Sequence, residues 1–156
     1  MPNWLHLLTN FLYHLGLALW IGGALALGAL VAPLLFRTLP RLDAGRLFGT
    51  ILRRFARLRL AAIVLVIIAA AVKHFVWETN ASVWIAVRWA AIAFLAFAVL
   101  YEVGFLERAL EARRVHLTPE MPEDHPDRRG FQQLHRRAEG LMKVSVLAAA
   151  VAMLLS

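Results

Sequence analysis

Long apolar runs separated by clusters of arginine dominate the chain and predict membrane-spanning helices. Four such runs are found, at about residues 11–36, 60–76, 83–106 and 138–155. A helix needs about 20 mostly apolar residues to cross a bilayer, and each run is near that length. We therefore expect an all-α integral membrane four-helix bundle with antiparallel neighbours, formed by a single transmembrane domain over residues 1–156.

The composition agrees with this expectation. Of the 156 residues, 61% are hydrophobic and only 17% are charged, which is too apolar for a soluble domain of this size to cover its own surface. The chain has no cysteine, so disulfides, thiolate metal ligands and thiol nucleophiles are excluded.

The arginines predict the orientation of the bundle. Residues 37–59 and 107–137 each contain seven arginines, whereas the short link between the second and third runs has no basic residue. Arginine-rich loops stay on the cytoplasmic side. We expect both loops to be cytoplasmic and the N- and C-termini to lie outside, in a multi-pass protein of the cell inner (plasma) membrane. The formal charge of +7 is then explained by topology and not by nucleic-acid binding.

The first basic loop has its own helical pattern. Apolar residues recur at helical spacing with arginines on the opposite side, at Leu47, Phe48, Ile51, Leu52 and Phe55. The pattern predicts an amphipathic cytoplasmic interfacial helix, or an extension of the second span, with Asp43 as its N-cap. Such a helix binds acidic lipid headgroups, binds a membrane partner or only anchors the bundle at the interface.

Ionisable residues in the outer halves of the spans are the first candidates for a site. His14 and His74 each lie about 6 Å inside the outer boundary, counting roughly 1.5 Å per residue, and Lys73 and Arg88 lie at a similar depth. Two imidazoles can ligate the iron of haem b, with the cations pairing its propionates; Met153 adds a soft ligand for a metal. The alternative is that both histidines form ordinary hydrogen bonds at the interface while the cations snorkel.

A row of small residues follows the first of these histidines. Ala18 and Gly22 succeed His14 at four-residue steps, which predicts a face where another helix approaches closely and where His14 points inward.

A second polar group is predicted near the inner ends of the last two spans. Glu102 lies at the end of the third span, and His135, Glu139 and Lys143 occur at four-residue steps before the fourth. A proton relay can be built from such groups. The alternative is a helix entrance stabilised by local ion pairs at the headgroups.

Several short segments resemble a known family. They are His14-Leu-Gly, Trp20-Ile-Gly-Gly23, Ala32-Pro33-Leu-Leu-Phe36, Leu39-Pro40-Arg41 and Ala44-Gly45, with Phe131 and Leu134-His135 opening the last span. They resemble the transmembrane protein 205-like family, which implies a small four-span fold and a membrane location but no defined activity. More distantly, the first span is similar to the copper-resistance D membrane domain and to J-type protoporphyrinogen oxidase, which implies that His14 is a haem or metal ligand.

The leading hypothesis is an integral membrane protein of undefined molecular activity with a haem b or metal site between the outer halves of spans one and two. The alternatives are a small transporter or exporter that acts as an oligomer, and a structural subunit of a membrane complex. Transport ranks second because the first span lacks a carboxylate like that of small multidrug exporters. No nucleophile elbow, phosphate loop or His-x-x-x-His motif is present, so enzyme activity stays open with the balance against it.

Overall fold

The computed structural model describes residues 3–78, 82–114, 122 and 125–156, and every regular element within these ranges is helical. The elements are, in chain order, α1 (Asn3–Ala26), η1 (Leu27–Val31), α2 (Ala32–Thr38), α3 (Arg41–Val76), α4 (Val83–Tyr101), η2 (Glu102–Leu106), α5 (Glu107–Arg114) and α6 (Pro126–Leu154). The two η elements are single π-helical turns inside longer helices. The all-α prediction is confirmed.

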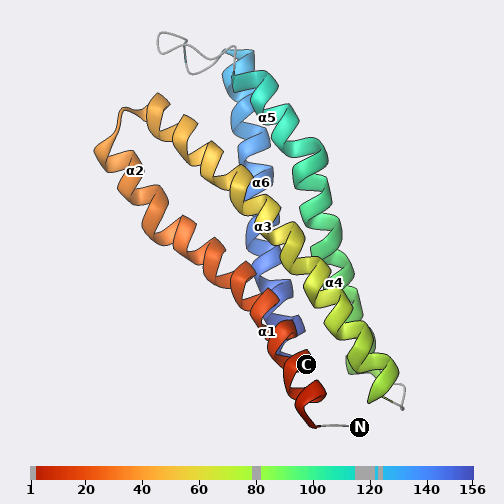
Figure 1. Cartoon of the computed structure of the whole chain (residues 1–156). Coiled ribbons are helices and arrows are strands. Elements are labelled where there is room, and N and C mark those ends of the chain that lie inside the picture. Colours follow the sequence, from red (N-terminus) through yellow and green to blue (C-terminus); the bar gives the residue numbers. More distant parts are fainter. Residues whose placement is uncertain (1–2, 79–81, 115–121, 123–124) are drawn as a thin grey trace.

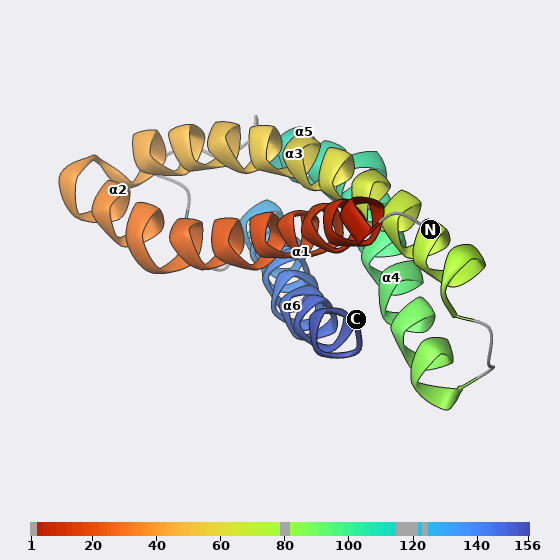
Figure 2. The same ribbon diagram turned by 60° about the horizontal axis from the view of Figure 1, so that its bottom comes forward.

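The helices form a ring of four rods (Figures 1 and 2). One rod is α1–η1–α2, the second is α3, the third is α4–η2–α5 and the fourth is α6. α1 packs against α3 and α6, and α4 packs against the same two helices. The start of α1, the end of α3, the start of α4 and the end of α6 lie at one end of the bundle, called here the terminal end, while the α2–α3 turn and α5 lie at the opposite end. Because both arginine-rich segments lie at that opposite end, we call it the basic end.

Three of the rods are long and apolar enough to cross a membrane, namely Asn3–Thr38, Arg41–Val76 and Val83–Arg114. α6 is not among them because Arg137, Glu139 and Lys143 interrupt its apolar stretch. The finding supports an integral membrane protein.

The first predicted cytoplasmic loop, residues 37–59, is mostly helical in the structure. α3 runs without a break from Arg41 to Val76, so the amphipathic segment is an extension of the second span and not a separate interfacial helix. The chain turns only at Leu39 and Pro40, because proline fixes its own φ and disfavours helix at the residue before it. Asp43 is not the N-cap: Pro40 holds that position without a side-chain cap, and Asp43 lies in the first turn.

Much of the second predicted loop, residues 107–137, is also helical. Glu107–Arg114 forms α5, which continues α4 and η2, and α6 already begins at Pro126. At the basic end the helices therefore extend well beyond the apolar stretches. The reason is that the arginine-rich segments Glu107–Arg114 and 127–137 consist largely of good helix formers and contain no proline.

Side chains from all four rods fill the centre of the bundle. The buried residues include Tyr13, Leu17 and Trp20 of α1, Ile63, Val66 and Ala70 of α3, Ile92, Leu95 and Val99 of α4, and Ala149 and Ala152 of α6. α1 approaches the backbone of α3 closely at Gly16, where an added Cβ would meet a methyl group of Val66 and lie 3.0 Å from the carbonyl oxygen of Ala62.

This crossing differs from the one that the sequence predicts. Ala18 and Gly22 are exposed, and a Cβ added at Gly22 would have no neighbour within 4 Å. The reason is the rotation of α1: the row of Tyr13, Gly16, Leu17 and Trp20 faces the core, so the row that contains Ala18 and Gly22 is turned towards the outside.

Candidate functional site

Two arginines are buried inside the bundle, and each is paired with a carboxylate. Arg88, on α4 near the terminal end, pairs with Glu78, and Arg59, on α3 towards the basic end, pairs with Glu102. Their side chains are only 2% and 1% exposed. A charge at membrane depth is costly and therefore marks a position to which a function is first assigned.

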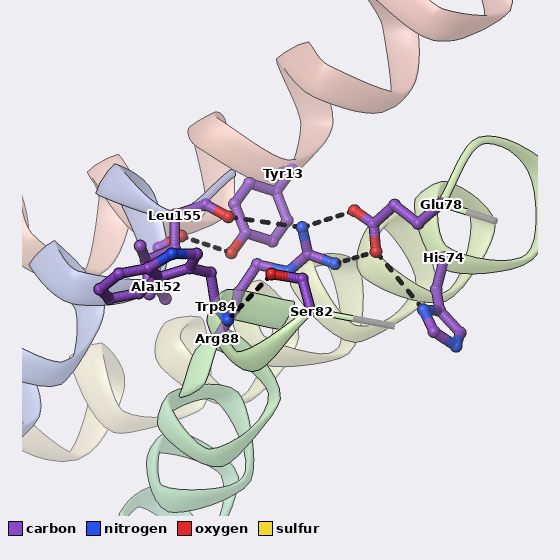
Figure 3. Close-up of polar contacts among 8 residues, drawn as sticks. All are labelled: Tyr13, His74, Glu78, Ser82, Trp84, Arg88, Ala152 and Leu155. Carbon is purple, nitrogen blue, oxygen red and sulfur yellow. Dashed lines mark hydrogen bonds and ion pairs between the residues drawn. The ribbon is translucent and has the colours of Figure 1, made fainter. Parts of the chain in front are cut away.

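At the terminal end, hydrogen bonds of Arg88 connect α4 to Glu78, which follows α3, and to Leu155, which follows α6 (Figure 3). We call these residues and the groups that contact them the Arg88 cluster. The two Nη groups of Arg88 donate to the two carboxylate oxygens of Glu78, each at 2.6 Å, and Nη1 also donates to the carbonyl oxygen of Leu155 at 3.4 Å. Paired guanidinium–carboxylate bonds of this kind are among the strongest hydrogen bonds in proteins. The hydrogen bonds from Arg88, helped by its charge, by His74 and by Lys73, hold the pKa of Glu78 below its ordinary range against the opposing effect of burial.

Three further residues complete this cluster. Nδ1 of His74 lies 3.4 Å from Oε2 of Glu78, and the ammonium group of Lys73 lies 5.2 Å from the centre of the Tyr13 ring, a cation–π distance. The hydroxyl of Tyr13 donates to the carbonyl oxygen of Ala152 at 2.7 Å. The cluster thereby connects α1, α3, α4 and the last turn of α6.

The structure places the predicted haem or metal ligands with different partners. His14 Nδ1 lies 2.8 Å from the carbonyl oxygen of Asn10, and its Nε2 lies 2.9 Å from Oγ of Ser156. Of the predicted set, His74, Lys73 and Arg88 belong to the same cluster around Glu78 and Tyr13, and Met153 packs against the apolar core. Among the residues that the structure describes, no group of three or more His, Asp or Glu side chains is placed to hold a metal ion. The haem or metal site stays a prediction.

The Arg59 cluster is built differently. Nη2 of Arg59 donates to Oε1 of Glu102 at 2.5 Å, and Nη1 lies 3.4 Å from the sulfur of Met142. The guanidinium carbon lies 5.2 Å and 4.9 Å from the ring centres of Trp20 and Phe55. In one respect the two clusters are alike: the Nε atoms of both Arg59 and Arg88 are buried and have no hydrogen-bond partner within the described ranges.

Polar groups of α1 and α6 extend the Arg59 cluster. The indole NH of Trp20 donates to Oγ of Ser145 at 3.2 Å, and that hydroxyl donates to the carbonyl oxygen of Met142 at 2.8 Å. Glu102 is the first residue of the π-helical turn η2, and such turns are frequent at functional sites. The cluster thus connects all four rods about 21 Å from the Arg88 level, as 14 residues of helix separate Arg88 from Glu102.

The predicted inner group is divided between two places. Glu102 faces Arg59, while Glu139 and Lys143 pair with each other at 2.7 Å on the exposed side of α6, and His135 stacks on Phe131 with 6.2 Å between the ring centres. The reason is again a rotation: Ser145, Ala149 and Ala152 define the buried face of α6, which turns Glu139 and Lys143 outward. Glu139 and Lys143 thus form an ion pair on α6, while the proton relay and its alternative, a helix entrance stabilised by local ion pairs, both stay predictions.

Two residues at the centre of these clusters, Arg59 and Glu78, were not predicted as site residues from the sequence. Arg59 counts there as one of seven topological arginines, although its spacing from Phe55, Ala62 and Val66 places it on the buried face of α3. Glu78 follows His74 by one helical turn and precedes the span of Arg88, and this spacing was the available signal for its role.

A lateral groove lies beside the Arg59 cluster. It has a volume of about 520 Å³ and lies between α1 with the start of η1 and the first half of α3; its lining residues are Ala18, Leu19, Gly22, Gly23, Ala26, Leu27, Ile51, Arg54, Phe55 and Leu58. Arg54 is the only charged residue among them. The Phe55 ring both lines the groove and stacks on Arg59, and Gly23 leaves room for it, because a Cβ at that position would collide with the ring.

Comparisons with known proteins give one match. No curated protein and no solved structure matches this chain. A family model described as a domain of unknown function matches residues 15–116, which is well over half of the chain and includes both buried arginines, their carboxylate partners and the groove. The match does not test the resemblance to the transmembrane protein 205-like family, which stays a prediction. The chain belongs to the family described as Domain of unknown function (DUF4149).

Proposed function

We propose that this protein is a four-span protein of the cell inner membrane that binds acidic lipids at its cytoplasmic, basic end and serves there as a structural, non-catalytic membrane component. The observation that carries the proposal is the gathering of exposed arginines at one end of the bundle. On α3 these are Arg41, Arg46, Arg54 and Arg57, and on α6 they are Arg129, Arg136 and Arg137. The cytoplasmic leaflet attracts such groups, each contributing about 1 kcal/mol near an anionic surface.

The packing of α6 supports a fourth span. Its apolar half, which includes the buried residues Ser145, Ala149 and Ala152, lies alongside α1 and α4, and the backbone of Ala152 accepts a hydrogen bond from Tyr13 in the first half of α1. The C-terminus and the N-terminus lie at the same end of the bundle (Figure 1). If α1 crosses the membrane, α6 must then cross it as well.

The centre of the bundle favours this role over transport through a single chain. Between the Arg59 and Arg88 levels the interior is filled by Leu17, Val66, Ile92 and Leu95, each at most 1% exposed. A polar substrate would have to pass this packed apolar layer. A transporter built from several copies stays the alternative.

Cysteine labelling tests the four-span topology, and the absence of native cysteine makes each introduced thiol unique. Ser156→Cys marks the terminal end and Thr50→Cys marks the basic end. In right-side-out membrane vesicles we expect a membrane-impermeant maleimide to label Ser156→Cys and not Thr50→Cys, and inverted vesicles to give the opposite result. Labelling of both positions from the same side would overturn the four-span assignment.

Thermal unfolding in detergent tests the lipid role. We expect added phosphatidylglycerol to raise the unfolding temperature more than phosphatidylcholine with the same chains, because a ligand that binds only the folded state stabilises it. High salt should reduce the difference through screening. Equal effects of the two lipids would contradict the proposal.

A further inference from the structure

We propose that the groove between α1 and α3 is a specific site for one acyl chain of an acidic phospholipid from the cytoplasmic leaflet, with the lipid phosphate at Arg54. The inference rests on the proposed function and adds a place and a stoichiometry to it. Two observations support it: the groove is apolar and opens laterally between α1 and α3, and the one charged residue in its lining, Arg54, has no acidic partner among the described residues.

The shape of the groove follows from the way α1 and α3 diverge. The two helices meet closely at Gly16 and Val66 and separate towards the basic end, where α2 and the start of α3 are joined by a short turn (Figure 2). The π-helical turn η1 begins at Leu27, which is also a lining residue. On the α1 side, four of the five lining residues are small, namely Ala18, Gly22, Gly23 and Ala26, which leaves space between the two helices.

The lining and the size of the groove fit an acyl chain. The volume of about 520 Å³ lies within the range of roughly 300–1,000 Å³ found for small-ligand sites. An α-helix with its side chains is about 10 Å across, so a partner helix would cover this groove and not enter it. Leu19 and Leu58, which line the groove, are 38% and 47% exposed; such leucines on a spanning helix face hydrocarbon and not water, so the groove opens to the lipid.

The charge at the groove selects an acidic headgroup. Arg54 is exposed and has no acidic partner in the described part of the chain, whereas its neighbour Arg53 is paired with Glu111 at 2.8 Å. Arg54 lies 22 residues before Val76, or about 33 Å along the helix, which is close to the thickness of about 30 Å of a hydrocarbon core. The guanidinium is therefore at the headgroup level of the cytoplasmic leaflet. The exposed Arg57, one turn away, adds a second positive charge.

Native mass spectrometry of the whole detergent-purified protein tests the proposal. The probes are phosphatidylglycerol and phosphatidylcholine with identical acyl chains, added separately. We expect one tightly held phosphatidylglycerol per chain and weaker binding of phosphatidylcholine. Gly22→Leu should fill the groove without a clash, because a Cβ there has no neighbour within 4 Å, and should weaken the tight binding at least about tenfold. Arg54→Gln should weaken it about fivefold, the factor that corresponds to one basic side chain near an anionic headgroup.

Matched controls separate the groove from the basic end as a whole. Gly140→Leu places the same side chain at an exposed α6 position with equally open space, and Arg108→Gln removes an exposed arginine of α5 at the same end, away from the groove lining; both should leave the tight lipid in place. Loss of binding in Arg108→Gln equal to that in Arg54→Gln would overturn the specific site while leaving the proposed function intact. Equal binding of both lipids to the unaltered protein would overturn both. A dimer that Gly22→Leu dissociates, with no lipid retained in either form, would assign the groove to a second copy and overturn the proposal.

Discussion

Arg88 and Arg59 are buried to almost the same extent, but their surroundings differ. Both Nη groups of Arg88 bind the carboxylate of Glu78, and one also reaches a backbone carbonyl. Arg59 has a single carboxylate contact, a thioether and two aromatic rings. The first arginine is held by oxygen atoms and the second largely by polarizable groups, which bind a cation more weakly than a carboxylate does.

This difference separates a structural role from an adjustable one. The Arg88 cluster connects Glu78, which follows the end of α3, to the backbone of Leu155 at the end of α6 (Figure 3). The Arg59 cluster lies behind Phe55, one wall of the lateral groove, and Glu102 begins a π-helical turn. We therefore expect the terminal end to contribute fixed geometry and the basic end to respond to what occupies the groove.

The largest expected effect comes from removing the carboxylate at the basic end. Glu102→Leu leaves Arg59, whose side chain is 1% exposed, without a counter-charge, and we expect a loss of about 3–5 kcal/mol in the free energy of unfolding. Thermal unfolding in detergent micelles measures this loss. The double variant Arg59→Met, Glu102→Leu should recover most of it, because a buried ion pair is often replaceable by apolar residues of similar volume.

A stable Glu102→Leu single variant would contradict this prediction. It would mean that the rings of Trp20 and Phe55 are enough to hold the guanidinium, and the contrast between the two arginines would disappear.

A smaller loss in the free energy of unfolding is expected from removing the carboxylate of Glu78 at the terminal end, and this loss should depend on pH. The pKa of Glu78 is lowered, chiefly by the hydrogen bonds from Arg88, so its stabilisation is complete at neutral pH and is lost as pH falls through that lowered pKa, below the ordinary glutamate value of about 4.3. Glu78→Gln should cost about 1–2 kcal/mol at pH 7, less than Glu102→Leu because the glutamine still accepts a hydrogen bond.

The pH profile of unfolding is the matching measurement. The unaltered protein should lose stability on acidification below about pH 4.3, and Glu78→Gln should flatten that part of the curve. An identical acid profile in both proteins would show that other carboxylates control acid stability.

The helices themselves were predictable from the sequence, because apolar runs of about 20 residues between arginine-rich flanks have few other solutions. The length of α3 was harder to predict from the sequence than the existence of the helices. The segment around Leu47 and Phe55 has the same period whether it forms a separate surface helix or continues the span, and only the absence of a break after Pro40 decides between them.

The candidate site was predictable only in part, because helical rotation is poorly specified in a lipid-facing bundle. In water, apolar residues indicate the buried face; in a membrane, residues such as Leu147 and Phe97 are apolar and exposed, so hydrophobicity does not separate the two faces. Arg88 was a candidate site residue on the basis of its depth alone, and its burial was not predicted. Arg59 was counted among the arginines that indicate topology and was therefore not recognised as a buried residue. The orientation of Glu139 and Lys143 depends on a rotation of α6 that their spacing does not determine.

The smallest expected effect concerns a single hydroxyl group. Tyr13→Phe removes the hydrogen bond to Ala152 and should cost about 1 kcal/mol. Tyr101→Phe is the control, because that ring is exposed and stacks between Phe97 and Phe105, and the cost should be near zero.

Pairing these variants tests whether the two ends are independent. Tyr13 and the Arg88–Glu78 pair both bind carbonyl groups in the last residues of α6, so Tyr13→Phe and Glu78→Gln should be non-additive by at least about 0.5 kcal/mol. Tyr13→Phe and Glu102→Leu lie at opposite ends, separated by the packed layer of Leu17 and Leu95, and their costs should add. Additivity in both pairs would show that the C-terminal turn is not held as one unit, whereas coupling in both would show that the apolar layer transmits changes between the two arginine clusters.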